Sequence, residues 1–171
     1  STHPLKVWID EEKLIEADAV IIATGASAKW LGLESEQRLN GFGVSACAVC
    51  DGFFFRGKEV AIVGAGDTAA EEALYLSKLC TTVHMFIRRD SMRASKVMQE
   101  RVQQTPNIKI YWNTETDEIL GENKVDSVRI KNIKTGEGEQ ALLGGNTFYY
   151  PKQKSNPATK AGLPKTHSFY Q

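Results

Sequence analysis

The feature that most constrains the fold is a glycine turn between an apolar run and a segment with helical periodicity. Residues 60–63 are mostly β-branched and predict a buried strand, and Gly64-Ala65-Gly66-Asp67-Thr68-Ala69 follows at once. From residue 67 to 79, apolar residues recur at helical spacing, which predicts a helix. A strand, a Gly-x-Gly-x-x-Ala turn and a helix in this order indicate a dinucleotide-binding βαβ unit.

The alternation of strand and helix continues after this unit and predicts an α/β fold with a parallel sheet and flanking helices. After Trp112 the apolar period changes to two, which predicts an antiparallel β meander. The fold class is therefore a Rossmann-like dinucleotide-binding domain with an appended meander. The expected helices are 67–79 and 92–104, and the expected strands are 60–63, 82–87, 108–112, 114–120, 125–133 and 139–143.

The two ends of the chain have weaker patterns. Residues 5–9 and 14–17 predict two edge strands around a turn, and the apolar run 19–25 predicts a strand buried on both faces. Residues 26–43 are expected to form a connection. Beyond Gly144, prolines and lysines predict an irregular segment.

The glycine turn has the composition of a phosphate site. Gly64 permits a tight turn, Gly66 lets a pyrophosphate approach the backbone, and Ala69 allows close packing of helix on strand. The helix N-terminus would then direct N–H groups and its dipole at the anion. The alternative is a glycine turn without a ligand.

Three arginines follow the second strand of this unit, and they indicate which dinucleotide is bound. An acid at this position favours a free ribose hydroxyl, whereas arginine favours a 2′-phosphate. Arg88, Arg89 and Arg93 lie within six residues, and guanidinium groups bind phosphate in a bidentate manner. The interpretation is NADPH. The alternative is a solvated surface on which Asp90 pairs with Arg93.

Cys47-Ala48-Val49-Cys50 is followed directly by Asp51. Two-residue spacing lets the sulfurs join, and such motifs depress a thiol pKa, while Asp51 offers a proton donor and acceptor. The alternatives are half of a zinc site, for which the sequence has no second Cys pair or His cluster, and two buried small residues. No metal is expected, and Cys80 is expected in the core.

Composition excludes several classes of partner. Lys plus Arg and Asp plus Glu both number 21, so no overall charge favours nucleic acid or a membrane surface. No apolar run has the length of a membrane span. Three cysteines suit a reducing compartment and a catalytic use, so a cytoplasmic location is expected. Because a nicotinamide reduces a disulfide poorly, a flavin is expected between the two.

These motifs are similar to those of the low-molecular-weight thioredoxin reductases, which are NADPH-dependent pyridine nucleotide-disulfide oxidoreductases. The resemblance rests on Ala23-Thr24-Gly25, on residues 43–53 and 64–76, and on Arg88-Arg89-Asp90 with Arg93. It implies that residues 1–33 end the first segment of an FAD domain, that 34–143 are the NADPH domain, and that 144–171 are a divergent tail. The linkers near Leu33 and Leu143 would act as hinges between two domain orientations.

The resemblance also implies residue roles. Cys50 would accept electrons from the flavin, Cys47 would attack the disulfide of thioredoxin or a thioredoxin-like protein, and Asp51 would move the proton. Thr24 and Gly25 would lie near FAD. The pyrophosphate side of NADPH would be held by Gly64, Gly66, Asp67 and Thr68, and its 2′-phosphate by Arg88, Arg89 and Arg93.

Because the first glycine fingerprint for FAD does not precede Ser1, FAD binding and turnover by this chain alone are not expected. The full enzyme is expected to be a homodimer through its FAD domain, which leaves this chain able to be a monomer. Two alternatives stay open. One is an NADP-binding module without turnover. The other is a peroxiredoxin-reducing flavoprotein, which would use NADH and therefore disagrees with Arg88-Arg89.

Overall fold

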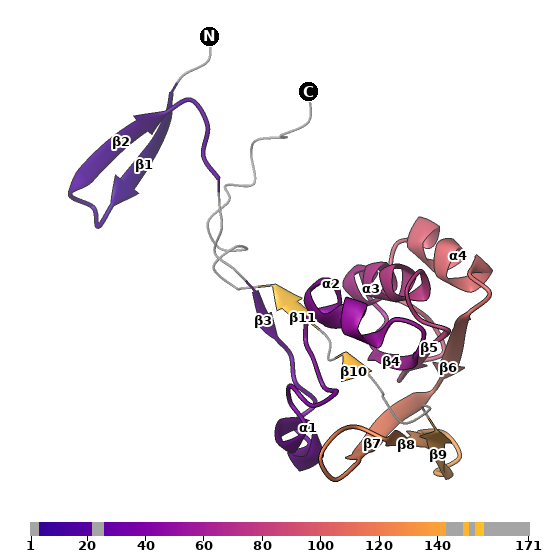
Figure 1. Cartoon of the computed structure of the whole chain (residues 1–171). Helices are drawn as coiled ribbons and strands as arrows, with labels where there is room; N and C mark the ends of the chain where they lie inside the picture. Colours follow the sequence, from indigo (N-terminus) through magenta and orange to yellow (C-terminus); the bar gives the residue numbers. More distant parts are fainter. Residues whose placement is uncertain (1–3, 22–25, 143–148, 151–152, 156–171) are drawn as a thin grey trace. The chain divides into compact units, whose positions relative to one another are not determined.

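The computed structural model describes residues 4–21, 26–142, 149–150 and 153–155 (Figure 1). The chain divides into two compact units, Ser1–Ser27 with Ser155–Gln171 and Ala28–Lys154. No helix within the described ranges has the length and apolar character of a membrane span. The strands are β1 (Leu5–Ile9), β2 (Lys13–Ala17), β3 (Ala26–Ala28), β4 (Glu59–Val63), β5 (Thr82–Ile87), β6 (Ile108–Trp112), β7 (Thr114–Leu120), β8 (Ser127–Asn132), β9 (Gly138–Leu142), β10 (Tyr149–Tyr150) and β11 (Gln153–Ser155). The helices are α1 (Glu34–Arg38), α2 (Ala48–Asp51), the 3-10 helix η1 (Gly52–Phe55), α3 (Asp67–Ser77) and α4 (Lys96–Gln104).

The first unit contains the antiparallel hairpin of β1 and β2. Asp10 and Glu11 adopt positive φ values of 48° and 61°, the left-handed conformation that reverses the chain in tight hairpins. Trp8 is 61% exposed. The two predicted edge strands are therefore confirmed.

A four-stranded parallel sheet forms the centre of the second unit, in the order β10-β4-β5-β6. Val60 pairs with Val83 across β4 and β5, and Val83 lies beside Ile108 of β6. The predicted β-α-β-α-β order and the parallel sheet are thus confirmed, and so is the α/β fold class.

The helices α3 and α4 cover one face of this sheet (Figure 1). Alternate residues of each strand point to this face, as the pleat requires. The resulting core includes fully buried Ala73 and Leu76 of α3 beneath Val60, Val83 and Met85 of the sheet.

The opposite face of the sheet is covered by β7 and β8 of the meander β7-β8-β9 and by the buried side chains of Leu39 and Val44. The meander is antiparallel, with a register shift between Thr116 and Glu118. A second core joins Ala61, Val63 and Phe86 of the sheet to the meander. Ser35 ties α1 to this layer, because its hydroxyl accepts the N–H of Ile119 at 3.0 Å. The predicted meander is confirmed.

Several sequence predictions were wrong in detail. Residues 19–21 form no strand, and Ile21 is 92% exposed, because no neighbouring strand pairs with them within the described ranges. The remainder of that apolar run, 22–25, lies outside the described residues. The connection 26–43 contains β3 and α1. Beyond Gly144, regular structure occurs as β10, which pairs with β4, and as β11, which pairs with β3.

Both central helices are shorter than predicted, for reasons seen in their hydrogen bonds. At the end of α3, the N–H groups of Lys78 and Leu79 bond three residues back, which tightens the last turn out of the α-helix. At the start of α4, the N–H groups of Arg93 and Ala94 donate to the carbonyl of Ala65. Those two residues are thereby held in a loop.

Candidate active site and dinucleotide cradle

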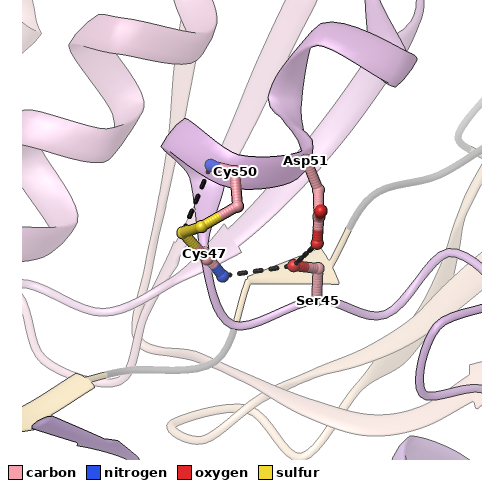
Figure 2. Close-up of a disulfide and its surroundings, with 4 residues drawn as sticks. All are labelled: Ser45, Cys47, Cys50 and Asp51. Atoms are coloured by element: carbon pink, nitrogen blue, oxygen red, sulfur yellow. Dashed lines mark hydrogen bonds between the residues drawn. A yellow bond between two sulfur atoms is a disulfide. The ribbon is translucent and has the colours of Figure 1, made fainter.

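Cys47 and Cys50 form a disulfide, with Cα atoms 5.2 Å apart (Figure 2). Cys47 is the residue before α2, and its Sγ accepts the backbone N–H of Cys50 at 3.2 Å. A hydrogen bond of this kind stabilises sulfur as a thiolate more than as a thiol. The predicted pairing of these two sulfurs is confirmed, and Cys47 is the sulfur with an N–H directed at it.

Ser45 links the disulfide to the neighbouring acid, a role that the sequence interpretation missed. Its hydroxyl oxygen accepts the N–H of Cys47 at 3.1 Å, and the same hydroxyl donates to the carboxylate of Asp51 (Figure 2). Asp51 therefore lies in the same hydrogen-bonded group as Cys47. The signal available in the sequence was a serine three residues before the start of a short helix, where such side chains bond to backbone N–H groups.

The helix α2, which contains Cys50, is packed directly on α3. Ala48 is fully buried, and a Cβ added to Gly52 would lie 2.8 Å from Cδ2 of Leu76. Glycine therefore allows the segment after α2 to approach α3 closely, and a side chain there would require the side chain of Leu76 to move. The outer side of the same segment is open, since Cys50 is exposed and Cys47 is half-buried. The side of α3 therefore packs against the segment that carries the disulfide, and the N-terminus of α3 lies at the predicted phosphate turn.

The glycine turn has the two properties expected of a phosphate cradle. Gly64 has a φ of +150°, and a Cβ there would lie 2.8 Å from the Cβ of Ala69, which confirms the predicted close packing of helix on strand. A Cβ on Gly66 would meet nothing within 4 Å. Gly66 precedes α3, and no side chain caps the helix there. The N-terminal N–H groups of α3, that of Thr68 among them, thus have an open approach that a pyrophosphate fits.

The arginine loop, residues 88–95, is tied to this turn. The carbonyl of Ala65 accepts the N–H groups of Arg93 at 2.7 Å and of Ala94 at 3.0 Å. A carboxylate oxygen of Asp67 accepts the N–H of Ser95 at 2.8 Å. Acceptance of this bond lowers the pKa of Asp67 below its usual value. The fold therefore brings the two halves of the predicted NADPH site together.

The arginine side chains are available for an anion. Arg88, Arg89 and Arg93 are exposed, and no ion pair joins them to a carboxylate in the described part of the chain. Asp90 pairs with Lys134 at 3.4 Å, whereas the alternative interpretation paired it with Arg93. The residues present therefore fit a phosphorylated dinucleotide.

Two buried titratable groups lie away from this site. Burial raises the pKa of the Cys80 thiol to about 11, and the thiol donates to the carbonyl of Phe55, so the predicted core position is confirmed. His84 is buried between Glu59 and Tyr111, and burial lowers its pKa despite the bond to Glu59. The described ranges contain no cluster of three or more residues suited to holding a metal ion.

Other predicted positions are not placed by the structure. Thr24 and Gly25 lie outside the described residues, and so does the hinge at Leu143. Leu33 is the residue before α1, and its hinge role stays a prediction. The assignment of Asp67 to the pyrophosphate also stays a prediction, although its carboxylate is bonded to Ser95.

Comparison with known proteins identifies the family. Residues 3–147 match the pyridine nucleotide-disulphide oxidoreductases. Thioredoxin reductase of Rickettsia prowazekii (strain Madrid E) is 47% identical over 140 residues, which are 80% of this chain and 45% of that relative. The structure of Lactococcus lactis thioredoxin reductase in the FR conformation matches with a TM-score of 0.72 and 37% identity over 91% of this chain and 52% of that chain. For thioredoxin reductase from Giardia duodenalis the TM-score is 0.70, with 44% identity over 90% of this chain and 50% of that chain.

The chain spans less than half the length of the curated relative from Rickettsia. The resemblance to thioredoxin reductases is confirmed, and it covers both the disulfide and the glycine turn. The chain belongs to the pyridine nucleotide-disulphide oxidoreductase family.

Proposed function

We propose that this chain carries the NADPH-binding and dithiol-bearing part of a thioredoxin-disulfide reductase. The observation that carries the proposal is the position of α3, which supports the Cys47–Cys50 disulfide and begins at an open glycine turn beside three arginines. Similarity to thioredoxin reductases over most of the chain supports the same reaction class. The cytoplasm is the proposed location, because a dithiol of this kind must be kept reducible.

The proposed cofactor site consists of the turn and the arginine loop. Gly64, Gly66 and the N-terminal N–H of Thr68 would hold the pyrophosphate, and Arg88, Arg89 and Arg93 would hold the 2′-phosphate. Bound NADPH supplies a hydride. FAD is proposed for the whole reductase, with Thr24 and Gly25 near it.

The proposed chemistry of this chain is thiol–disulfide exchange. The Cys47 thiolate attacks the partner disulfide, a mixed disulfide forms, and one partner sulfur leaves as thiolate and takes up a proton. The Cys50 thiolate then attacks Cys47, which re-forms the Cys47–Cys50 disulfide and releases the partner as a dithiol. Asp51, held by Ser45, is placed to pass the proton. Two electrons move from the Cys47–Cys50 dithiol to the partner.

The proposed protein partner is thioredoxin or a protein like it. Val49, Phe53 and Phe54 are 65%, 63% and 72% exposed beside the disulfide. Exposed aromatic residues grouped at a reactive centre favour a protein partner over a small disulfide. Replacement of Phe53 and Phe54 by alanine is expected to slow thioredoxin reduction severalfold, while the reaction with a small aromatic disulfide stays unchanged.

A trapping experiment tests this function. The chain is reduced with dithiothreitol, freed of it, and mixed with thioredoxin whose resolving cysteine is replaced by serine. The remaining active-site cysteine of this thioredoxin carries a chromogenic thiol as a mixed disulfide, and that thiol is the leaving group. The Cys50→Ser variant is expected to accumulate a mixed disulfide of one chain with one thioredoxin, and Cys47→Ser is not. Cys80→Ser is the matched control and should behave as wild type.

Three measurements separate this proposal from the alternatives. An adduct formed by Cys47→Ser and absent from Cys50→Ser would reverse the two cysteine roles. Absence of both adducts, together with tight NADPH binding, would favour a binding module without turnover. A fluorescence titration with no preference for NADPH over NADH would remove the cofactor assignment, and a disulfide-reduction assay with and without added FAD measures whether the chain turns over by itself.

A further inference from the structure

Asp67 is at a position where a direct contact with a dinucleotide phosphate is unfavourable. It is the first residue of α3, and its carboxylate is an anion in front of the proposed pyrophosphate cradle. A direct contact would bring two anions together, which electrostatic repulsion disfavours. Its carboxylate oxygen is instead bonded to the N–H of Ser95, across the two halves of the site.

Hydrogen bonds to neighbouring segments hold the arginine loop at both of its ends. At its beginning, the carbonyl of Arg89 accepts the N–H of Asn113 at 3.1 Å. At its end, Arg93 and Ala94 donate to Ala65, and Ser95 donates to Asp67. Ala94 is buried, while Arg93 is exposed. The backbone of this exposed loop is thus fixed by a few hydrogen bonds. Two of them involve side chains: Asp67 accepts the N–H of Ser95, and the amide of Gln99 donates to the carbonyl of Ala94 at 2.7 Å. Of these two side chains, that of Asp67 comes from the glycine-turn side of the site.

A backbone that is fixed in advance lowers the entropic cost of bringing several long guanidinium side chains onto one phosphate. The pyrophosphate cradle does not depend on the hydrogen bond between Asp67 and Ser95, since it is formed by the α3 N-terminus and Gly66. Loss of this bond should therefore weaken the contact with a 2′-phosphate and leave the contact with the rest of the dinucleotide intact.

We infer that Asp67 is a positioning residue that sets the preference for NADPH over NADH by holding the arginine loop against the glycine turn. The inference rests on the proposed function, because it requires the arginines to bind the 2′-phosphate. The role of Asp67 is to accept the Ser95 N–H, and its negative charge is not required for it.

The test is a fluorescence titration of the full chain with NADPH and with NADH. Asp67→Ala is expected to lower NADPH affinity about fivefold to tenfold, the effect of one lost hydrogen bond of ordinary strength, and to change NADH affinity less than about twofold. Asp67→Asn keeps an acceptor oxygen and should restore NADPH affinity to within about twofold of wild type. Glu71→Ala, an exposed acid one turn later on α3, is the matched control and should not change either affinity.

A second variant acts on the other partner of the bond. Ser95 has a φ of −57°, which proline adopts without strain, so Ser95→Pro deletes the N–H and keeps Asp67. It should reproduce the loss of NADPH preference, and it covers the case in which Asp67→Ala does not fold.

Four outcomes overturn the inference: an unchanged preference in Asp67→Ala and Ser95→Pro, an equal loss of both dinucleotides, tighter NADPH binding by Asp67→Ala, or a failure of Asp67→Asn to restore binding. Failure of the proposed function is seen separately, in the wild type, as binding without preference for NADPH.

Discussion

Replacement of Gly64 by alanine tests whether the glycine turn is built as described. The new side chain would have to adopt a φ of +150° and would place its Cβ 2.8 Å from the Cβ of Ala69. Backbone strain of this kind costs about 1 to 3 kcal/mol, and overpacking against a buried helix adds about 1 to 3 kcal/mol. We therefore expect Gly64→Ala to lower the free energy of unfolding by about 2 to 6 kcal/mol, a large share of the stability of a typical domain.

The measurement is urea unfolding followed by circular dichroism. With a denaturant slope of about 2 kcal/mol per molar urea, the expected loss moves the midpoint down by about 1 to 3 M. Gly66→Ala is the matched control, because its φ is −93° and a Cβ there meets nothing within 4 Å. Its free energy of unfolding should stay within about 1 kcal/mol of wild type, the difference between glycine and alanine before a helix.

The two variants should separate stability from binding. In Gly66→Ala the new methyl group occupies the space proposed for the pyrophosphate, so NADPH affinity should fall more than about tenfold although the fold is intact. A Gly64→Ala chain that unfolds within about 0.3 M urea of wild type would refute the strain argument. A Gly66→Ala chain with wild-type NADPH affinity would refute the cradle.

Three further predictions concern single side chains. Ser45→Ala should lower the free energy of unfolding of the oxidised chain by about 1 to 2 kcal/mol, because it deletes the bonds to Cys47 and Asp51. Ser45→Thr should retain both bonds, and chemical denaturation compares the two variants. Burial lowers the pKa of His84 from 6.5, so the unfolded chain binds this proton more readily than the folded chain as pH falls below about 6.5. The melting temperature should therefore decline from about pH 7 to about pH 5.5, and His84→Gln should flatten that decline. With a thiol pKa of about 11, Cys80 should resist iodoacetamide at about pH 8 until denaturant is added, as peptide mass spectrometry can show.

Local patterns were sufficient to predict β4, β5 and β6 of the central sheet and the strands of the meander, whereas β10 was not predicted. β5, β6 and β7 have the predicted bounds, because each is a run of strand-forming residues between turns, and their neighbours in space are also neighbours in sequence. The glycine turn and the cysteine pair were identifiable for the same reason, since the residues that perform each role lie within six positions of one another.

The parts that sequence alone did not predict depend on contacts between distant residues. The start of α4 is set by the carbonyl of Ala65, and the placement of α1 by a bond from Ile119 to Ser35. Residues 19–21 have the composition of a buried strand, but a strand also needs neighbours to pair with. Ser45 was visible in the sequence, yet its connection to both Cys47 and Asp51 appears only in three dimensions.

The position of β10 has a consequence for how the chain is made. Tyr149 and Tyr150 lie beside Ala61 and Ile62, so β4 has its second neighbour only after the whole meander has been translated. Until then, a growing chain on the ribosome would present one side of an apolar strand with unpaired backbone groups, which is the kind of edge that recruits other strands. Timely translation of the two tyrosines would therefore protect the nascent protein from aggregation.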